Sequence, residues 1–408
     1  MTKQKKESTT KKRKKASDAS SSTEKTSTKP LEGISFTVDQ KDISAILAAM
    51  NPICSKRTTL EVTNCILFEV GYKELILKST DLEISLQSSC PIQESTLDEP
   101  RSFLVLGKRI FEVVKELEGI ITCTLTLNQL IMQSGGVKLA LNIKDAQEFP
   151  PFPERIENLM HVDAAQLSAM LDGVAFLIPQ TNANPALNGL FLEINNEQMT
   201  LTATDGHCLA QVRTSQLTLK EERSWLLPRR AIFELKKLLD GYPDKTLFVG
   251  TCGNQLVFSG EVFNFFTKLL ADSFPQYKAI MDKDDFTPAT IDRTQFIKTL
   301  RRSATLLSGQ FLATQFHFKP DAVQVRMNNK EVGTLEEEVA MSGEKTEEMD
   351  VRFYAPYLLN GLQSFNDDQL TFYLKNNTKP IVFESTKPEM SLTYLVMPVA
   401  PVSTNAPA

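Results

Sequence analysis

The chain has 408 residues, 41% of them apolar and 23% charged, with a formal net charge of −5 at pH 7. This length predicts two to four domains with ordinary hydrophobic cores, and no run of about 18 apolar residues could cross a membrane. Six scattered cysteines without a CxxC pair argue against a disulfide framework or a zinc site, and the basic N-terminus has no apolar signal segment, so we expect a cytoplasmic protein with reduced thiols.

Charge is distributed unevenly along the chain. Residues 1–30 contain ten Lys and Arg against three Asp and Glu, a net charge of +7, which leaves −12 for the remainder. The segment is rich in Lys, Ser and Thr and has no apolar periodicity, so residues 1–31 are predicted to form a disordered basic tail. We interpret Lys11–Lys15 as part of this solvated tail, with a nuclear address or a nucleic-acid tether as the alternative.

The segment after the tail shows strand and helix periodicity in turn. The predicted ranges are strand Ser35–Val38, helix Lys41–Met50, strands Cys65–Val70 and Glu74–Leu77, helix Lys108–Leu117, and strands Ile120–Leu127, Gln129–Gln133 and Val137–Leu141. Two helices and many strands of this kind predict an α+β domain with antiparallel sheets.

The landmarks of this segment return twice more along the chain. Leu77–Asp81 (LKSTD) matches Leu201–Asp205 (LTATD) 124 residues later, and a further step of 124 reaches Asn328 in a strand-like run. Two more sets recur at nearly the same spacing: Phe36–Asp39, His161–Asp163 and Thr290–Asp292, and then Val105–Arg109, Leu226–Arg230 and Arg352–Pro356. A period this long predicts three copies of one domain, because the units of a solenoid are far shorter.

Boundaries between the copies are predicted at the proline-rich Phe149–Pro153 and at the acidic Asp282–Asp285. We therefore expect three repeated α+β domains, each with two helices and antiparallel sheets, at residues 32–152, 153–284 and 285–400, followed by a loose C-terminal tail at 401–408. The repeat restricts the function to one that uses three copies of a single fold.

Basic residues gather on the predicted helices, on the face opposite the apolar one. They are Lys108, Arg109 and Lys115 in the first copy, Arg229, Arg230, Lys236 and Lys237 in the second, and Lys298, Arg301 and Arg302 in the third. One charged helix face is usual in any protein, but matching faces in an acidic chain predict a positive concave surface that binds phosphates.

Four segments carry a resemblance to a known family. They are Leu187–Leu190 (LNGL), Thr204–Ala210 (TDGHCLA), Leu269–Tyr277 with its Phe274-Pro275-x-Tyr277 core, and Tyr394–Pro398 (YLVMP). In this order and on this repeat, residues from about Ile34 to Val399 resemble the bacterial DNA polymerase III beta subunit, the replicative sliding clamp. The resemblance implies a head-to-tail homodimer that closes a six-domain ring with helices inside. It also implies a DNA replication processivity factor, without catalytic residues, cofactor or metal, which encircles double-stranded DNA independently of sequence and tethers the polymerase.

The family also implies a peptide pocket between the second and third domains, for short linear motifs of the DNA polymerase III alpha subunit, the clamp loader and repair proteins. Carried over by position, its wall is Leu187, Thr204, Gly206, His207, Leu209, Pro275, Ile280, Pro380, Leu395, Val396, Met397 and Pro398. These residues are mostly apolar, as expected of a groove that anchors one or two hydrophobic side chains. Three departures bear on its polarity: Cys208 and Ala279 stand where basic residues are common, and the chain continues beyond Val399.

The resemblance places the subunit interface between the third domain of one chain and the first domain of another. The residues concerned are Leu306 and Leu307 with the acidic Glu331, Glu336, Glu337 and Glu338 on one side, and Lys138, Leu139 and Leu141 on the other. Towards the DNA, Lys56 and Arg57 occupy a loop that approaches the duplex in the family. Pro185 and Ala186 replace an aromatic pair of some relatives, so stacking on the DNA there is not expected.

Two other classes of protein compete with this interpretation. A thiol enzyme could use Cys208 beside His207, but neighbouring residues on a strand point to opposite faces, and no GxSxG, P-loop, HExxH or GxGxxG motif accompanies them. A clamp-like scaffold that binds peptides but no longer encircles DNA is the second alternative, favoured by the acidic body and the missing aromatic pair. The oligomeric state distinguishes this scaffold from a clamp that encircles DNA, because a ring requires a stable dimer.

Overall fold

The computed structural model describes residues 33–153, 155–219, 221–242, 246–307, 313–343 and 348–399. The predicted tails at 1–31 and 401–408 lie outside these ranges. Each of the three domains runs in one order: strand, helix, four strands, helix, three strands. The predicted threefold repeat and the α+β class are therefore confirmed, whereas the residues at which one domain passes into the next stay a prediction.

The first domain holds every element expected from its sequence. Its bounds are β1 (Ile34–Asp39), α1 (Gln40–Cys54), β2 (Cys65–Val70), β3 (Glu74–Thr80), β4 (Ile84–Pro91), β5 (Arg101–Leu106), α2 (Gly107–Val114), β6 (Ile120–Leu125), β7 (Gln129–Ser134) and β8 (Val137–Asp145). The second helix ends three residues earlier than predicted, at Val114, and the last strand continues four residues further, to Asp145.

The second and third domains repeat this order. The second contains β9 (Glu157–Asp163), α3 (Ala164–Val174), β10 (Gly189–Ile194), β11 (Met199–Thr204), β12 (Cys208–Thr214), β13 (Arg223–Pro228), α4 (Arg229–Asp240), β14 (Thr246–Cys252), β15 (Gln255–Ser259) and β16 (Phe263–Lys268). The third contains β17 (Thr287–Asp292), α5 (Arg293–Thr305), β18 (Thr314–Phe318), β19 (Ala322–Asn329), β20 (Gly333–Gly343), β21 (Met349–Phe353), α6 (Ala355–Leu362), β22 (Gln369–Leu374), β23 (Ile381–Thr386) and β24 (Ser391–Val396).

One capping residue explains the most regular landmark of the repeat. The first helix of each domain begins directly after an aspartate, namely Asp39, Asp163 and Asp292. Each carboxylate accepts a hydrogen bond from a backbone N–H in the first turn of its helix, at 2.7–2.9 Å. Such a cap satisfies a donor that the helix itself leaves unpaired. The recurring aspartate therefore marks where a strand passes into a helix.

Two 12-stranded sheets run along the molecule, and each one crosses a domain boundary. The first crosses where β4 of the first domain pairs with β16 of the second, with Leu86 opposite Phe265. The second crosses where β12 of the second domain pairs with β24 of the third, with Ala210 opposite Tyr394. Backbone hydrogen bonds between strands therefore join consecutive domains in addition to the connecting chain.

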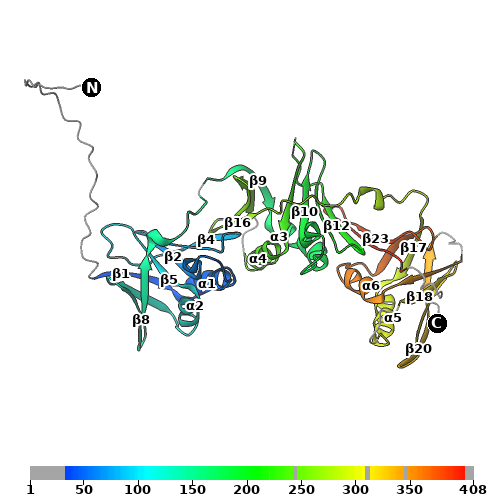
Figure 1. Cartoon of the computed structure of the whole chain (residues 1–408), viewed down its shortest axis with the longest axis horizontal. Coiled ribbons are helices and arrows are strands. Elements are labelled where there is room, and N and C mark those ends of the chain that lie inside the picture. The colour runs from blue at the N-terminus through cyan, green and yellow to red at the C-terminus, as the bar shows by residue number, and fades with distance from the viewer. Residues whose placement is uncertain are drawn as a thin grey trace, which may run out of the picture.

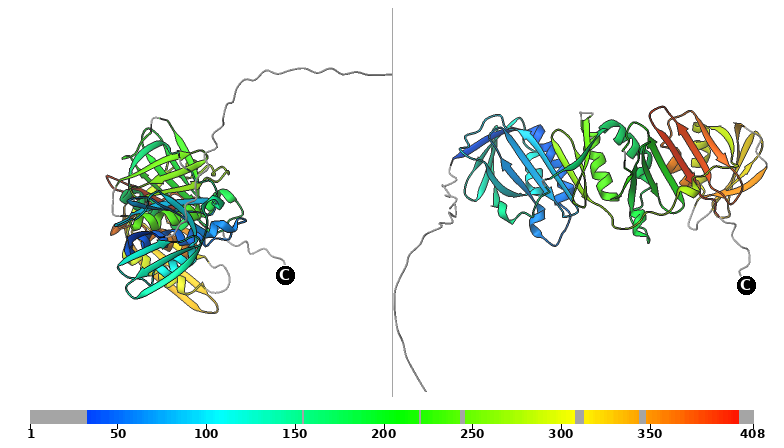
Figure 2. Two further views of the ribbon diagram at one scale, coloured as in Figure 1. Left: turned by 90° about the vertical axis from the view of Figure 1, so that its left-hand side faces the viewer. Right: turned by 90° about the horizontal axis from the view of Figure 1, so that it is seen from above.

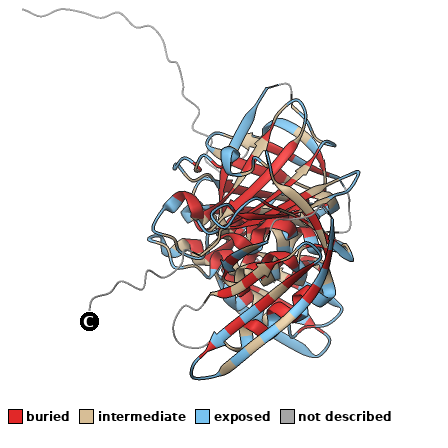
Figure 3. Ribbon diagram, turned by 90° about the vertical axis from the view of Figure 1, so that its right-hand side faces the viewer, coloured by how far each residue is buried: buried red, intermediate tan, exposed pale blue. Residues whose placement is uncertain are grey.

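The three domains lie in a row that bends into a shallow arc (Figure 1). The helices face the concave side of this arc, and the strands form its outer layer. Seen from above, the row of three domains is nearly straight (Figure 2). Burial follows this arrangement, since buried and exposed positions alternate along the long β19–β20 hairpin at the end of the third domain (Figure 3).

Apolar residues on the helices and the inner faces of the strands form the core. In α1 the buried Ile43, Ile46, Leu47 and Met50 recur at helical spacing and face the sheet. All six cysteines are free thiols, and all but Cys252 are buried. Within the described ranges, no helix combines the length and the apolar character that crossing a membrane requires.

Candidate functional site

The helices of the concave side carry a charge opposite to that of the chain as a whole. Helices α1 to α6 contain eleven Lys and Arg against five Asp and Glu, a net charge of +6. The remainder of the chain beyond the basic tail is strongly acidic. Positive charge is therefore concentrated on the one surface that a row of three domains presents inward.

The predicted basic stripe of the first domain is present on α2 and just after it. The side chains of Lys108, Arg109 and Lys115 are 64–69% exposed, while Ile110 and Val114 on the opposite face are fully buried. Glu112 lies between the first two basic residues, 2.9 Å from the Arg109 guanidinium. Exposed pairs of this kind contribute less than about 1 kcal/mol, so they leave these cations available to a phosphate.

The basic residues of α4 are engaged more closely within the protein. The Nε of Arg229 donates to the carbonyl of Ile178 at 2.9 Å, and its guanidinium stacks 4.2 Å from the centre of the Phe233 ring. Lys236 contacts Asp172 and Asp240, both at 2.9 Å. Its hydrogen bonds to these carboxylates raise the pKa of Lys236 above its ordinary value.

Arg230, one of the residues predicted to face DNA, is engaged with the first domain. Its guanidinium forms an ion pair with Asp81 of the first domain and donates to the carbonyl of Pro52 at 3.0 Å. The Asp81 side chain is fully buried, and Lys56 approaches it to 3.7 Å. Arg230 therefore holds the first two domains together, and part of the charge of Lys56 is directed to the same carboxylate.

Asp81 is stabilised as an ion by its surroundings. Burial alone would raise the pKa of this carboxyl, but hydrogen bonds from the backbone N–H groups of Ile84 and Glu83 and from Arg230 outweigh burial and lower it. Asp205 in the second domain likewise accepts from two backbone N–H groups, those of His207 and Cys208. The repeated Thr-Asp pair thus closes a turn between two strands, as one interpretation of the sequence suggested.

The third-domain stripe lies on α5, which contains four basic residues and no acidic one. Lys298 and Arg301 are exposed. Arg302 instead makes a two-pronged contact with Glu337 of β20, including 2.9 Å between its Nε and a carboxylate oxygen. Two residues predicted for separate surfaces, the DNA-facing one and the subunit interface, therefore meet each other. The remaining predicted cations, Arg57 and Lys237, are exposed.

Several residues of the predicted peptide pocket come together where the second and third domains join. The backbone N–H of Met397 donates to the carbonyl of His207 at 2.9 Å, and the Leu187 side chain lies beside Gly206. Gly206 has a φ of +95°, which favours glycine at this turn. The His207 ring stacks on Tyr357 of α6, with 5.5 Å between ring centres. Exposed polar and half-buried apolar groups thus meet at one seam.

Other predicted wall residues lie beneath this surface. Leu209 and Leu395 belong to a buried cluster with Phe274 and Tyr277, and Pro380 is buried as well. Val396 has 0% exposure and belongs to the main core, so its prediction as a peptide-contacting residue is corrected. The accessible predicted residues are Thr204, Gly206, His207, Pro275, Ile280, Met397 and Pro398.

Sequence reasoning missed Tyr357, which stacks on His207. This residue lies on the second helix of the third domain, where the first two domains have their basic stripes. Helix α6 contains no charged residue, so a search for basic faces passed over it. The Tyr-Ala-Pro-Tyr sequence at the start of α6, with proline in the first turn, was the available signal.

The predicted interface residues other than Leu306, Leu307 and Glu331 lie on two strand segments that, among the described residues, pair with no strand along one edge. β8 pairs with β7 along its first part and with β5 only from Ile143 to Asp145. β20 pairs with β19 from Gly333 to Ala340 and with β17 only beyond that. The half-buried Leu306 and Leu307 follow α5 beside this edge, where the Leu306 carbonyl accepts a hydrogen bond from Asn329.

The thiol beside His207 is unsuited to catalysis. Cys208 is 1% exposed, and burial raises its pKa to about 12. It is therefore protonated at neutral pH, whereas a nucleophilic cysteine must be a thiolate.

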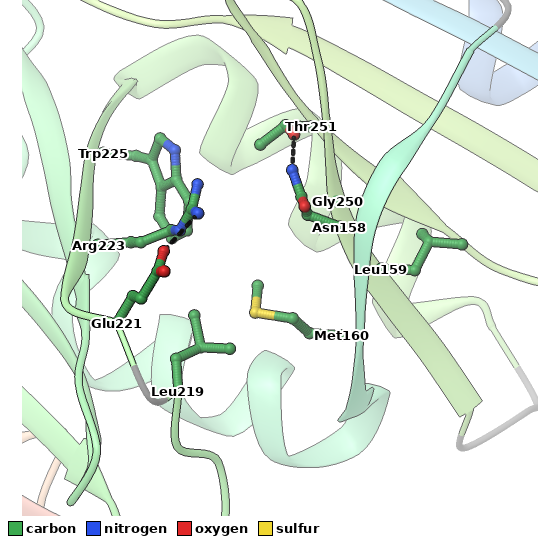
Figure 4. A pocket seen from close by; sticks show the side chains of 9 residues that line it. All are labelled: Asn158, Leu159, Met160, Leu219, Glu221, Arg223, Trp225, Gly250 and Thr251. Atoms are coloured by element: carbon green, nitrogen blue, oxygen red, sulfur yellow. Dashed lines mark hydrogen bonds and ion pairs between the residues drawn. The ribbon is translucent and has the colours of Figure 1, made fainter.

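A separate hollow of about 360 Å³ lies in the second domain between β13 and the β9–β14 pair (Figure 4). One wall contains Trp225, the only tryptophan of the chain, and the facing strand contributes Leu159 and Met160. Arg223 at its rim pairs with Glu221 at 2.9 Å. No sequence pattern predicted this hollow, because its two walls come from segments far apart in the chain.

Comparison with known families decides the identity of this architecture. The models of the N-terminal, central and C-terminal domains of the DNA polymerase III beta subunit match residues 34–153, 161–276 and 278–400, in that order. The chain belongs to the DNA polymerase III beta subunit family. The predicted resemblance is thereby confirmed over all three domains.

Individual beta sliding clamps align with this beta subunit along nearly their whole length. The beta sliding clamp of Pseudomonas aeruginosa is 25% identical over 369 residues, covering 89% of this chain and 99% of the relative. That of Bacillus subtilis is 23% identical over 378 residues, covering 90% and 99%. The crystal structure of the Pseudomonas aeruginosa DNA polymerase sliding clamp superimposes with a TM-score of 0.82 at 22% identity, over 90% of this chain and all of the other. A DNA polymerase III beta subunit from Thermotoga maritima gives the same TM-score at 22% identity, over 91% and 100%.

Proposed function

We propose that this chain is a DNA sliding clamp, which encircles duplex DNA and tethers the replicative polymerase so that synthesis is processive. The observation that carries this proposal is the net charge of +6 on the six concave helices of an otherwise acidic chain. Contacts from such helices to phosphates attract any duplex, whatever its sequence, and carry no positional information. A ring that binds in this way can slide.

The strand order supports closure of two chains into a ring. β8, β16 and β24 hold the same place in the three domains, as do β4, β12 and β20. Within the chain, β4 pairs with β16 and β12 with β24. β20 and β8 are the remaining members of the two sets, at opposite ends of the row. A contact between different surfaces must close or form a filament, and two arcs of three domains close into six.

The seam around His207 and Met397 is the proposed docking site for partners. It exposes an aromatic stack, a glycine turn and half-buried apolar groups at a domain junction, which suits an extended segment with one or two hydrophobic anchors. The proposed partners are the DNA polymerase III alpha subunit, the clamp loader and repair proteins, each through a short linear motif. The protein acts by tethering them, without catalysing a reaction of its own.

Two measurements on the full chain test this function. Native mass spectrometry should give a dimer, and after loading on nicked circular plasmid the protein should stay bound through gel filtration in high salt. Linearising the plasmid should then release it, because topology and not affinity retains a ring. A stable monomer that binds a polymerase peptide but is not retained on the circle would favour the peptide-binding scaffold instead.

A further inference from the structure

We propose that the outer edge of β9, which is the edge that does not face β14, binds an extended segment of a partner protein. The segment adds a strand to β9 and inserts one large apolar side chain into the hollow between Trp225 and Met160. The site lies within the second domain, so it does not depend on the proposed ring. β9 belongs to the outer layer of strands (Figure 1), so a partner bound there leaves the concave side free.

The first strand of each domain pairs along one edge with a strand of its own sheet, and in two domains the opposite edge is closed as well. In the first domain the connection after β4 closes it. The N–H of Thr37 donates to the carbonyl of Glu94 at 2.9 Å, and the Thr37 carbonyl accepts from the N–H of Gln93 at 3.0 Å. In the third domain β20 closes it, with Ser342 opposite Thr290.

The same edge is open in the second domain. Among the described residues, β9 is the last strand of its sheet, and no backbone hydrogen bond joins its outer edge to another segment. His161 lies two residues before the capping aspartate, as Thr37 and Thr290 do. Successive residues of a strand direct their backbone groups alternately to its two edges, so those of His161 point outward as those of Thr37 do. Unpaired groups on a strand edge are a template for another strand.

A shorter chain segment explains why this edge is open. In the first domain, Gly107 begins α2 and lies 107 − 81 = 26 residues after Asp81. In the second domain, Arg229 begins α4 and lies 229 − 205 = 24 residues after Asp205. The segment that should close the edge is therefore two residues shorter, which is about 7 Å of extended chain.

The hollow of about 360 Å³ lies beside this open edge. Its walls include Met160, three residues before the capping aspartate, and Trp225, three residues before the one that precedes α4 (Figure 4). Both are half-buried. The residues at the equivalent places of the other domains are at most 3% exposed: Phe36 and Phe103 in the first, and Ala289 and Val351 in the third. The second domain therefore leaves two core positions uncovered where its edge is open.

The chemistry of the hollow defines its occupant. Trp225 and Met160 offer apolar surface, which favours an aromatic or large aliphatic side chain. At the rim, Arg223 and Glu221 neutralise each other at 2.9 Å, so an uncharged stretch of chain is the best match. The basic tail of this chain is a poor match, because residues 2–30 carry a net charge of +7 and contain no apolar side chain larger than proline.

The segment that closes this edge in the first domain supplies the probe. It is a synthetic peptide of residues 91–98 with blocked ends, which includes Ile92 and Leu97, both part of the core in the first domain. Added to the full chain, it should shift the emission of Trp225 to the blue in a saturable way, because an apolar side chain replaces water beside the only tryptophan. The same peptide with Ile92→Ala and Leu97→Ala is the control and should give no shift.

Two variants at one position test the strand edge itself. His161→Pro removes the outward N–H and should weaken peptide binding at least about tenfold, because a backbone hydrogen bond is lost and the proline ring occupies the edge. His161→Ala keeps this N–H and should bind the peptide like the parent. In the unmodified chain, the peptide should slow amide hydrogen exchange in residues 157–163, and this measurement does not depend on the folding of any variant.

Several results would overturn the proposal. One is an emission of Trp225 that does not shift at peptide concentrations up to about 1 mM. Another is unchanged binding to His161→Pro, or equal weakening by His161→Pro and His161→Ala, because the backbone edge would then not carry the binding. A shift without slower exchange in residues 157–163 would place the peptide elsewhere. None of these results bears on the ring, which native mass spectrometry tests separately.

Discussion

The contact between Arg230 and Asp81 allows a quantitative test of how the first two domains are held together. The Asp81 side chain is 0% exposed and that of Arg230 is 30% exposed. Arg230→Ala therefore leaves a buried carboxylate with two backbone hydrogen bonds and with Lys56 at 3.7 Å. Breaking a buried ion pair by removing one partner costs about 3–5 kcal/mol. Because Arg230 is partly solvated and Asp81 keeps other donors, we expect a loss of about 2 kcal/mol.

The assay is a double-mutant cycle of Arg230→Ala, Asp81→Asn and both together, followed by urea unfolding. Trp225, the only tryptophan, lies on the strand before α4 and reports on the second domain. A coupling energy of about 2 kcal/mol is expected at pH 7. Arg155→Ala is the matched control, since Arg155 pairs with Glu157 at an exposed site, and it should leave the unfolding curve unchanged.

The coupling should also depend on pH in a defined direction. The pKa of Asp81 is lowered in the folded protein, whereas an unfolded aspartate has a pKa of about 3.9. A lowered carboxylate pKa stabilises the fold fully above the unfolded value, and the contribution is lost as pH falls through the folded value. The difference between the Arg230→Ala variant and the parent should therefore be constant above about pH 5 and shrink below about pH 4. A coupling energy below about 0.5 kcal/mol at pH 7 would refute the view that this pair joins the domains.

Three further predictions concern the surfaces of the proposed clamp. Leu306→Ala with Leu307→Ala should weaken the dimer by about 2–3 kcal/mol, because both leucines are already half-buried in the single chain. This loss corresponds to roughly a 30- to 150-fold rise in the dissociation constant of the dimer. Native mass spectrometry at nanomolar concentration measures that constant, and an unchanged dimer would place the interface elsewhere. Lys298→Glu with Arg301→Glu should lower the slope of DNA affinity against salt by about 2 in magnitude without altering sequence preference, and an unaltered slope would mean that α5 does not face the duplex. Met397→Ala should weaken binding of a polymerase-derived peptide by about 1 kcal/mol in calorimetry, with the α5 variant as the matched control; equal affinity in both would exclude this seam as the docking site.

The repeat could be predicted because its markers are local. Asp39 and its two counterparts cap a helix within three residues, and the Thr-Asp pair closes a turn within four residues. Such short-range chemistry leaves a pattern that a single sequence displays. The family, the threefold repeat and the α+β class were therefore predictable, and so was the concentration of basic residues on helices.

The partners of individual charges could not be predicted in the same way. Asp81 precedes Arg230 by 149 residues, and Glu337 follows Arg302 by 35, so neither contact leaves a trace in local spacing. The role of Val396 was misjudged for a related reason. β24 is buried on both faces over most of its length: Val396 faces the main core with Leu392 and Tyr394, and Leu395 on the other face packs against residues of the second domain. A motif matched to a family by position predicts where a strand lies, but it does not predict how far each side chain of that strand is buried.

The continuity of the two sheets across domain boundaries determines where such a ring can come apart. Each junction inside a chain combines paired strands, packed side chains and a covalent connection, and the first also has the buried Arg230–Asp81 contact. In the proposed ring, the junction between chains would have equivalent strand edges but no peptide link. A clamp loader that opens the proposed ring to admit DNA would therefore meet the least resistance between β20 and β8. Opening there would separate two strand edges that can pair again, so a loaded ring could reseal without any part of a chain unfolding.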